Sequence, residues 1–141
     1  MFHPRLVVAA AAAILFVATA HAETLRFHAT MNGHTEVPPK TTNGLGTVDA
    51  TFDTATKKLD YNATWHGLSG PATMAHFHGP AEPGANARIV VPWGDNPTSP
   101  FTGTATLTDQ QAADLIAGRW YANVHTAQNP PGEIRGQLLR E

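Results

Sequence analysis

The sequence predicts an all-β domain, an antiparallel Greek-key β-sandwich with one short helix near 109–117. Three observations lead to this prediction. Apolar residues recur mainly at every second position, which is the period of a half-buried strand. Glycine and proline are frequent, with 12 and 11 residues, and such residues separate short segments by turns. Charged residues make up only 14% of the chain, which favours a compact β domain over a disordered tail or a helical bundle.

The first three strands are expected to form an antiparallel meander. Residues 25–31, 47–53 and 59–65 each alternate apolar with polar side chains, so each is predicted to have one buried and one wet face. The connection between the second and third strands, residues 53–58, is short and polar and therefore suits a hairpin.

Five further strands are expected, three before the helix and two after it. They cover residues 73–77, 89–91, 102–107, 120–125 and 133–139. Proline and glycine mark the turns and loops around them, at residues 38–39, 79–80, 92–100 and 129–132.

The single helix is predicted from its end signals. Thr108 is a suitable N-cap, and Gln111 three residues later completes a capping box. Gly118 follows the last apolar residues and is expected to end the helix.

The first 22 residues are predicted to be a secretory signal peptide. A short basic start is followed by an apolar run at residues 6–18 and by Ala20-His21-Ala22, so cleavage is expected between Ala22 and Glu23. The apolar run is too short for a comfortable spanning helix, although an uncleaved anchor is the alternative. The prediction is a single domain, residues 23–141, in the periplasm or secreted, with no membrane attachment after cleavage.

Charge and composition exclude several function classes. The net charge is −2 at pH 7, and without a basic patch we expect no nucleic-acid binding. The chain has no cysteine, so neither a disulfide nor a thiol nucleophile is available. It also lacks a nucleophile elbow, a phosphate loop and an HExxH helix. No catalytic residue is predicted, and the sequence favours a non-enzyme.

The main chemical signal is a pair of histidines, His76 and His78, with a third, His125, in a later strand. Residues two apart on a strand project from the same face, ~7 Å apart. Imidazole suits Cu(II), Zn and Ni, and Cu(II) has the highest divalent affinity. The three residues are therefore predicted metal ligands, with copper as the cofactor. The alternative is that these histidines are structural and hold loop backbone by hydrogen bonds.

Several blocks of sequence carry a resemblance to a known family. They are His-Phe-His-Gly-Pro-Ala at 76–81, Gly-Arg-Trp-Tyr-Ala-Asn-Val-His-Thr at 118–126, and Asn-Pro-Pro-Gly-Glu-Ile-Arg-Gly-Gln-Leu at 129–138. Glu-Val-Pro-Pro at 36–39 and Gly-Leu-Ser-Gly at 67–70 are earlier landmarks. On these residues the chain resembles the CHRD domain, the module named for chordin and found alone in many secreted bacterial proteins.

The resemblance implies a β-sandwich, immunoglobulin-like or superoxide-dismutase-like, over nearly the whole chain after the leader. The histidine pattern is loosely similar to the copper site of copper–zinc superoxide dismutases, so dismutase-like redox activity is a minor branch of the copper hypothesis. His34 and His66 are not carried over as ligands, because the family does not require histidine there. The second hypothesis is a non-catalytic module that binds protein or matrix partners through its proline-rich loops. The oligomeric state is left open.

Other residues have competing interpretations. Met74 or Met31 is a possible soft ligand for copper. Glu133 is a possible hydrogen-bond acceptor for a metal-bound imidazole, and Arg135 a possible guide for an anion. The alternatives are an exposed ion pair or a buried Arg135 that holds loop carbonyls, and a structural, loop-fixing role is favoured. Residues 36–39 can be a ligand-binding edge but more often end and protect a strand. The three tryptophans are Trp65, Trp93 and Trp120. They can form a sugar-binding platform, yet packing in the core is the better prediction.

Overall fold

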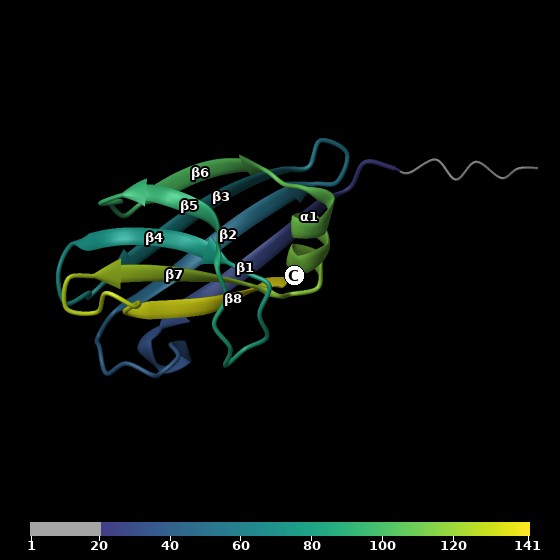
Figure 1. The fold of residues 1–141 in the computed structure, drawn as a ribbon. Coiled ribbons are helices and arrows are strands. Elements are labelled where there is room, and N and C mark those ends of the chain that lie inside the picture. The colour runs from purple at the N-terminus through teal and green to yellow at the C-terminus, as the bar shows by residue number, and fades with distance from the viewer. Residues whose placement is uncertain (1–20) are drawn as a thin grey trace, which may run out of the picture.

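The structure, a computed structural model, describes residues 21–141. The predicted signal peptide lies almost wholly outside these residues. Eight strands, one 3-10 turn (η1) and one α-helix follow one another along the chain (Figure 1). They are β1 (Thr24–Asn32), η1 (Gly33–Thr35), β2 (Leu45–Asp53), β3 (Lys58–His66), β4 (Ala72–His78), β5 (Ile89–Asp95), β6 (Phe101–Thr106), α1 (Asp109–Ile116), β7 (Trp120–Thr126) and β8 (Ile134–Arg140).

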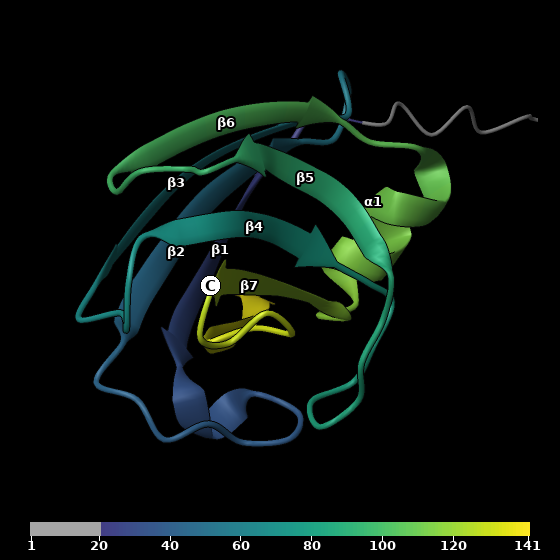
Figure 2. The ribbon, with the colours of Figure 1, turned by 60° about the vertical axis from the view of Figure 1, so that its left-hand side comes forward.

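The strands form one antiparallel sheet in the order β5-β4-β7-β8-β1-β2-β3-β6. The all-β class and the β1-β2-β3 meander are therefore confirmed. The predicted sandwich of two sheets is not what is found, because β1 is hydrogen-bonded to β8 on one side and to β2 on the other. The sheet curls until its end strands β5 and β6 lie side by side, giving a nearly closed barrel (Figure 2).

The interior of the barrel holds the apolar residues that alternate along the strands. Phe27, Val48, Leu59 and Phe77 are all buried there. Aromatic side chains fill the space between the two end strands, where the rings of Trp93 and Phe101 stack with their centres 5.6 Å apart. The tryptophan prediction is met for Trp93 and Trp120, which are buried core residues, while Trp65 packs half-buried against the core.

The helix prediction is confirmed in detail. Thr108 accepts a hydrogen bond from the Gln111 backbone, and the Gln111 side chain accepts one from the Thr108 backbone, which is the expected capping box. Gly118 has a positive φ of 72° directly after the helix. Leu115 is fully buried, and α1 contacts β8 at one end of the barrel (Figure 1).

Most strands extend one or two residues beyond the predicted ranges, and β5 departs most from its prediction. Pro92 predicts that residues 92–95 lie in a loop, but β5 continues through this proline to Asp95. Strand β5 is the last in the sheet order, and an edge strand tolerates a residue that has no N–H to donate.

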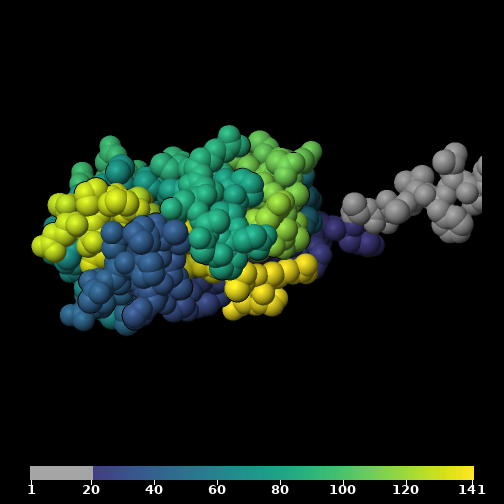
Figure 3. Space-filling model, turned by 60° about the horizontal axis from the view of Figure 1, so that its bottom comes forward, coloured from purple at the N-terminus to yellow at the C-terminus, as the bar shows by residue number. Residues whose placement is uncertain are grey.

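Two segments cover the outer surface of β4, β7 and β8, and we call them the covering loops: residues 33–44, between β1 and β2, and residues 79–88, between β4 and β5. They lie over the same face of the molecule, in blue and teal (Figure 3). The Asn86 side chain links them by donating to the Val37 carbonyl at 3.2 Å. Within the part of the chain that the structure describes, no helix is long and apolar enough to cross a membrane.

Candidate metal centre

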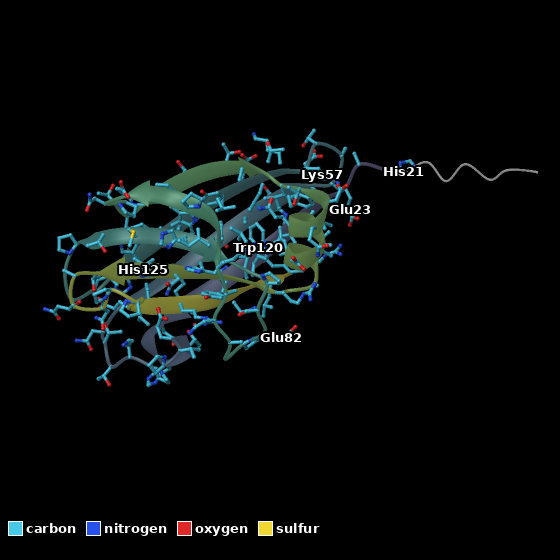
Figure 4. The ribbon with its side chains drawn as sticks, viewed as in Figure 1. His21, Glu23, Lys57, Glu82, Trp120 and His125 are labelled. Atoms are coloured by element: carbon cyan, nitrogen blue, oxygen red, sulfur yellow. The ribbon has the colours of Figure 1, made fainter. Side chains whose placement is uncertain are left out.

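Strands β4 and β7 pair so that their polar residues lie on the outer surface of the barrel, under the covering loops. Ala75 and Phe77 point into the core, so His76 and His78, which alternate with them, face outward. Strand β7 alternates in the same way and presents His125 on this surface. His125 lies at the end of the barrel remote from α1 (Figure 4).

The three predicted ligands converge. One ring nitrogen from each of His76, His78 and His125 lies within 4.8 Å of the others, and we call these residues the histidine triad. His76 Nδ1 is 3.2 Å from His125 Nε2. Two nitrogens bound to one tetrahedral metal at ~2.0–2.1 Å are about 3.3 Å apart, so this pair has the spacing that a shared ion requires.

Backbone carbonyls fix the orientation and tautomer of two of the rings. His78 Nδ1 donates to the Ala87 carbonyl at 3.0 Å, and His125 Nδ1 donates to the Pro130 carbonyl at 2.7 Å. In each ring the proton therefore lies on Nδ1, and Nε2 carries the lone pair. The lone pair of His125 Nε2 faces His76 Nδ1 at hydrogen-bond distance. His78 Nε2 is buried and has no hydrogen-bond partner. A histidine that donates one nitrogen to a carbonyl and directs the other at a shared point is the usual arrangement around a bound metal.

The rings are neutral. Burial lowers the pKa of His76 to about 4, with smaller contributions from the neighbouring His125 and His78. Burial also lowers the pKa of His78 and of His125, against the opposing effect of their carbonyl acceptors. Neutral imidazole is the form that binds metals, so protons do not compete for these lone pairs near neutral pH.

The chain matches the family model of the CHRD domain over residues 27–138. It belongs to the CHRD domain family. The match includes all three residues of the histidine triad and nearly the whole barrel. It confirms the family suggested by the sequence. No curated protein and no solved structure matches the chain.

A stack of side chains continues from the triad across the outer surface of this CHRD domain. The rings of His78 and Tyr121 are parallel, with centres 4.8 Å apart. The Arg135 guanidinium lies on the Tyr121 ring, 3.5 Å from its centre. Arg135 also donates to the Ala85 carbonyl at 2.7 Å and to the Asn86 side chain at 3.1 Å. Arg135 therefore holds the covering loop 79–88 in place.

Glu36 is a second buried charged group near the triad. Its side chain accepts a hydrogen bond from Asn123, which pairs with His76 across β4 and β7. Burial raises the pKa of Glu36 to about 7, although Arg135 and Asn123 act in the opposite direction. Together with Val37, Pro39 and Arg135 it lines a hollow of ≈ 360 Å³ between the covering loops. Residues 36–39, predicted from the sequence to be a strand end or a ligand-binding edge, thus lie in the covering loop 33–44 above the outer surface of the sheet.

Glu133 fixes a different set of loops. Its carboxylate accepts hydrogen bonds from Thr42, Ser69 and Thr126 at 2.5–2.8 Å. The loop-fixing interpretation of Glu133 and Arg135 is therefore the one that the contacts support, but each residue secures its own loops and they do not pair with each other.

The remaining sequence candidates lie apart from one another. His34 and His66 are exposed and are not in the triad cluster. Met31 is fully buried in the barrel core, so it is not a ligand for a metal at the triad on the outer surface. Met74 lies on the outer surface and is 41% exposed. Sequence reasoning missed Tyr121, although the period of two places it on the same face as His125.

Proposed function

We propose that this CHRD domain binds one transition-metal ion, copper, through His76, His78 and His125 after export from the cytoplasm. The observation that carries the proposal is the convergence of three neutral ring nitrogens within 4.8 Å. Two of the rings are held in the metal-binding tautomer by backbone carbonyls. Histidines with a merely structural role would not need to leave a buried His78 Nε2 without a partner.

Copper is favoured by the donor set. Three imidazoles without a thiolate or carboxylate suit Cu and Zn, and Cu(II) exceeds Zn(II) in affinity for the same nitrogen site. The leader-like residues 1–22 support export to the periplasm or medium.

Metal titration tests this function directly. We would titrate Cu(II), Cu(I) and Zn(II) into residues 23–141, which contain all the strands, and compare the wild type with His78→Ala and with His66→Ala. The His78 variant removes an aligned lone pair, whereas His66 is an exposed histidine outside the triad. We expect the His66 variant to bind as the wild type does and the His78 variant to lose at least about tenfold in affinity.

Equal binding by all three proteins would refute the proposed site. Circular dichroism of the His78 variant would establish that its barrel is intact. Should copper bind, a superoxide assay on the loaded protein would decide whether the site also cycles between oxidation states. A role as a protein- or matrix-interaction module stays a prediction.

A further inference from the structure

The position of Met74 relative to the triad is set by strand pairing. Met74 lies directly opposite His125 in the β4–β7 register, and the register continues without interruption to His76 and His78. Side chains directly opposite on one face have Cβ atoms ~4.5–5.5 Å apart. Ala75 is buried in the core, so Met74 shares the outer face with His76. The flexible thioether is therefore a cross-strand neighbour of one ligand and a same-strand neighbour of another.

Met74 is also unusual in its exposure. It is 41% exposed, whereas the triad histidines are 5–9% exposed. Methionine is an apolar side chain that normally fills core gaps, as the fully buried Met31 does. The only sulfur on the outer surface of the described residues thus belongs to an exposed strand neighbour of two buried triad histidines.

The charges around the triad favour a monovalent ion. The cluster contains histidines alone, so its ligands carry no negative charge to offset the metal. The positively charged Arg135 lies on the far face of the Tyr121 ring that stacks on His78. The carboxylate of Glu133 is engaged by hydroxyl and backbone donors elsewhere. The nearer carboxyl, Glu36, has a pKa raised by burial to about 7, accepts from Asn123 and has Arg135 as its cationic neighbour, so it is not a ligand of the triad. Burying an ion without compensating charge costs more for a divalent than for a monovalent cation.

Ligand chemistry points the same way. Thioether sulfur is a soft ligand that selects Cu(I), whereas Zn(II) in proteins takes nitrogen, thiolate and carboxylate. We propose that Met74 is a fourth ligand, that its thioether binds Cu(I) beside the histidine triad, and that this residue makes the site select Cu(I) over Zn(II). The inference rests on the proposed metal function and adds the oxidation state of the bound copper. It also adds the path by which the ion enters the site, because an exposed thioether is the first ligand that an arriving ion meets.

Replacement of Met74 by leucine tests the proposal. Met74→Leu keeps a similar volume at an exposed position, so the barrel is expected to fold normally. We expect Cu(I) affinity, measured anaerobically by competition with a chromophoric chelator, to fall at least about tenfold, while Zn(II) affinity stays within about twofold. Ile89→Leu is the matched control, since Ile89 is an exposed apolar residue beside His78 on β5, and it is expected to change neither affinity.

Methyl-¹³C methionine spectra give a second readout. Cu(I) should shift the Met74 methyl resonance and leave the Met31 resonance in place, and Zn(II) should shift neither strongly. If Cu(I) and Zn(II) both bind through the histidines while Met74 neither shifts nor affects affinity, Met74 is not a ligand and the triad proposal stands alone. If the wild type binds no metal at all, the proposed function fails and the role of Met74 fails with it.

Discussion

Glu133 shows how a single buried charge can organise this protein. It is completely inaccessible to solvent, and its two oxygens accept hydrogen bonds from four side chains and one backbone N–H. Burial by itself would raise the pKa of this carboxyl, but the hydrogen bonds from Ser69, Thr126 and Thr42 outweigh burial and lower it to about 2. The ionised form is therefore the one that the folded state stabilises.

Glu133→Gln is expected to destabilise the fold by about 3 kcal/mol at pH 7, which is the pKa change from 4.5 to about 2 expressed as free energy. Because the folded pKa lies below the unfolded one, this stabilisation is present above pH 4.5 and is lost as the pH falls toward about 2. Urea unfolding at several pH values would measure it. The wild type should approach the variant at the acid end of this window.

Glu82→Gln provides the control at the residue scale. Glu82 is an exposed carboxylate in the covering loop 79–88 and points away from the barrel (Figure 4). Its replacement should change the unfolding free energy by less than about 0.5 kcal/mol. If the difference in unfolding free energy between the wild type and Glu133→Gln stays constant down to pH 2, the charge-based explanation is contradicted.

At the scale of elements, the covering loop 79–88 is held mainly by side chains of β7 and β8, beside one backbone hydrogen bond from the Ala81 N–H to the Arg119 carbonyl. Arg135 binds Ala85 and Asn86, and the Tyr121 hydroxyl accepts from the Ala87 N–H at 3.1 Å. The Ala87 carbonyl in turn accepts from His78. The orientation of one triad ring therefore depends on a loop that is fixed from β7 and β8.

Arg135→Lys is expected to loosen this loop without unfolding the barrel. A lysine ammonium is a point charge and does not reproduce the planar guanidinium, which here stacks on Tyr121 and binds two loop groups together. Amide hydrogen exchange should accelerate at Ala87 by about tenfold or more, while amides of the β1–β2 pair keep their protection.

Arg140→Lys is the matched control, since Arg140 is exposed and makes only a surface ion pair with Glu23. Its exchange pattern should equal that of the wild type. Unchanged exchange at Ala87 in the Arg135 variant would show that the loop is held by its own turns.

At the scale of the whole molecule, the barrel is closed by aromatic packing. The end strands β5 and β6 are not hydrogen-bonded neighbours in the sheet of the described residues. Trp93 bridges them, with ring contacts to Phe77, Tyr61 and Phe101 at centre distances of 5.0–5.6 Å. Such contacts add to the apolar burial that drives folding.

Trp93→Ala is expected to cost about 3–5 kcal/mol, because it removes a large buried side chain and leaves a cavity. The loss should be visible as a lower urea midpoint and as faster amide exchange in β5 and β6 in particular. Leu139→Ala, at a position 53% exposed, should change stability by less than about 0.5 kcal/mol. Exchange that accelerates equally in all strands would indicate that the seam between β5 and β6 is no weaker than the rest of the sheet.

The local structure follows from the amino-acid sequence alone: the alternating strands, the capped helix from Thr108 to Gly118, and the shared face of His76 and His78. These features depend on neighbours a few residues apart, so a period or a cap is sufficient to predict them. The CHRD resemblance was likewise visible in short blocks of residues.

The other features depend on contacts between residues far apart in the chain. A half-buried strand has the same pattern in a sandwich as in a barrel, so the single curled sheet depends on β1 pairing with β8, far away in the chain. The same is true of Pro92, which is tolerated because β5 lies at an edge. The triad became a candidate site through carbonyls of Ala87 and Pro130, which long-range loop packing brings to the rings and which no spacing of residues in the sequence encodes.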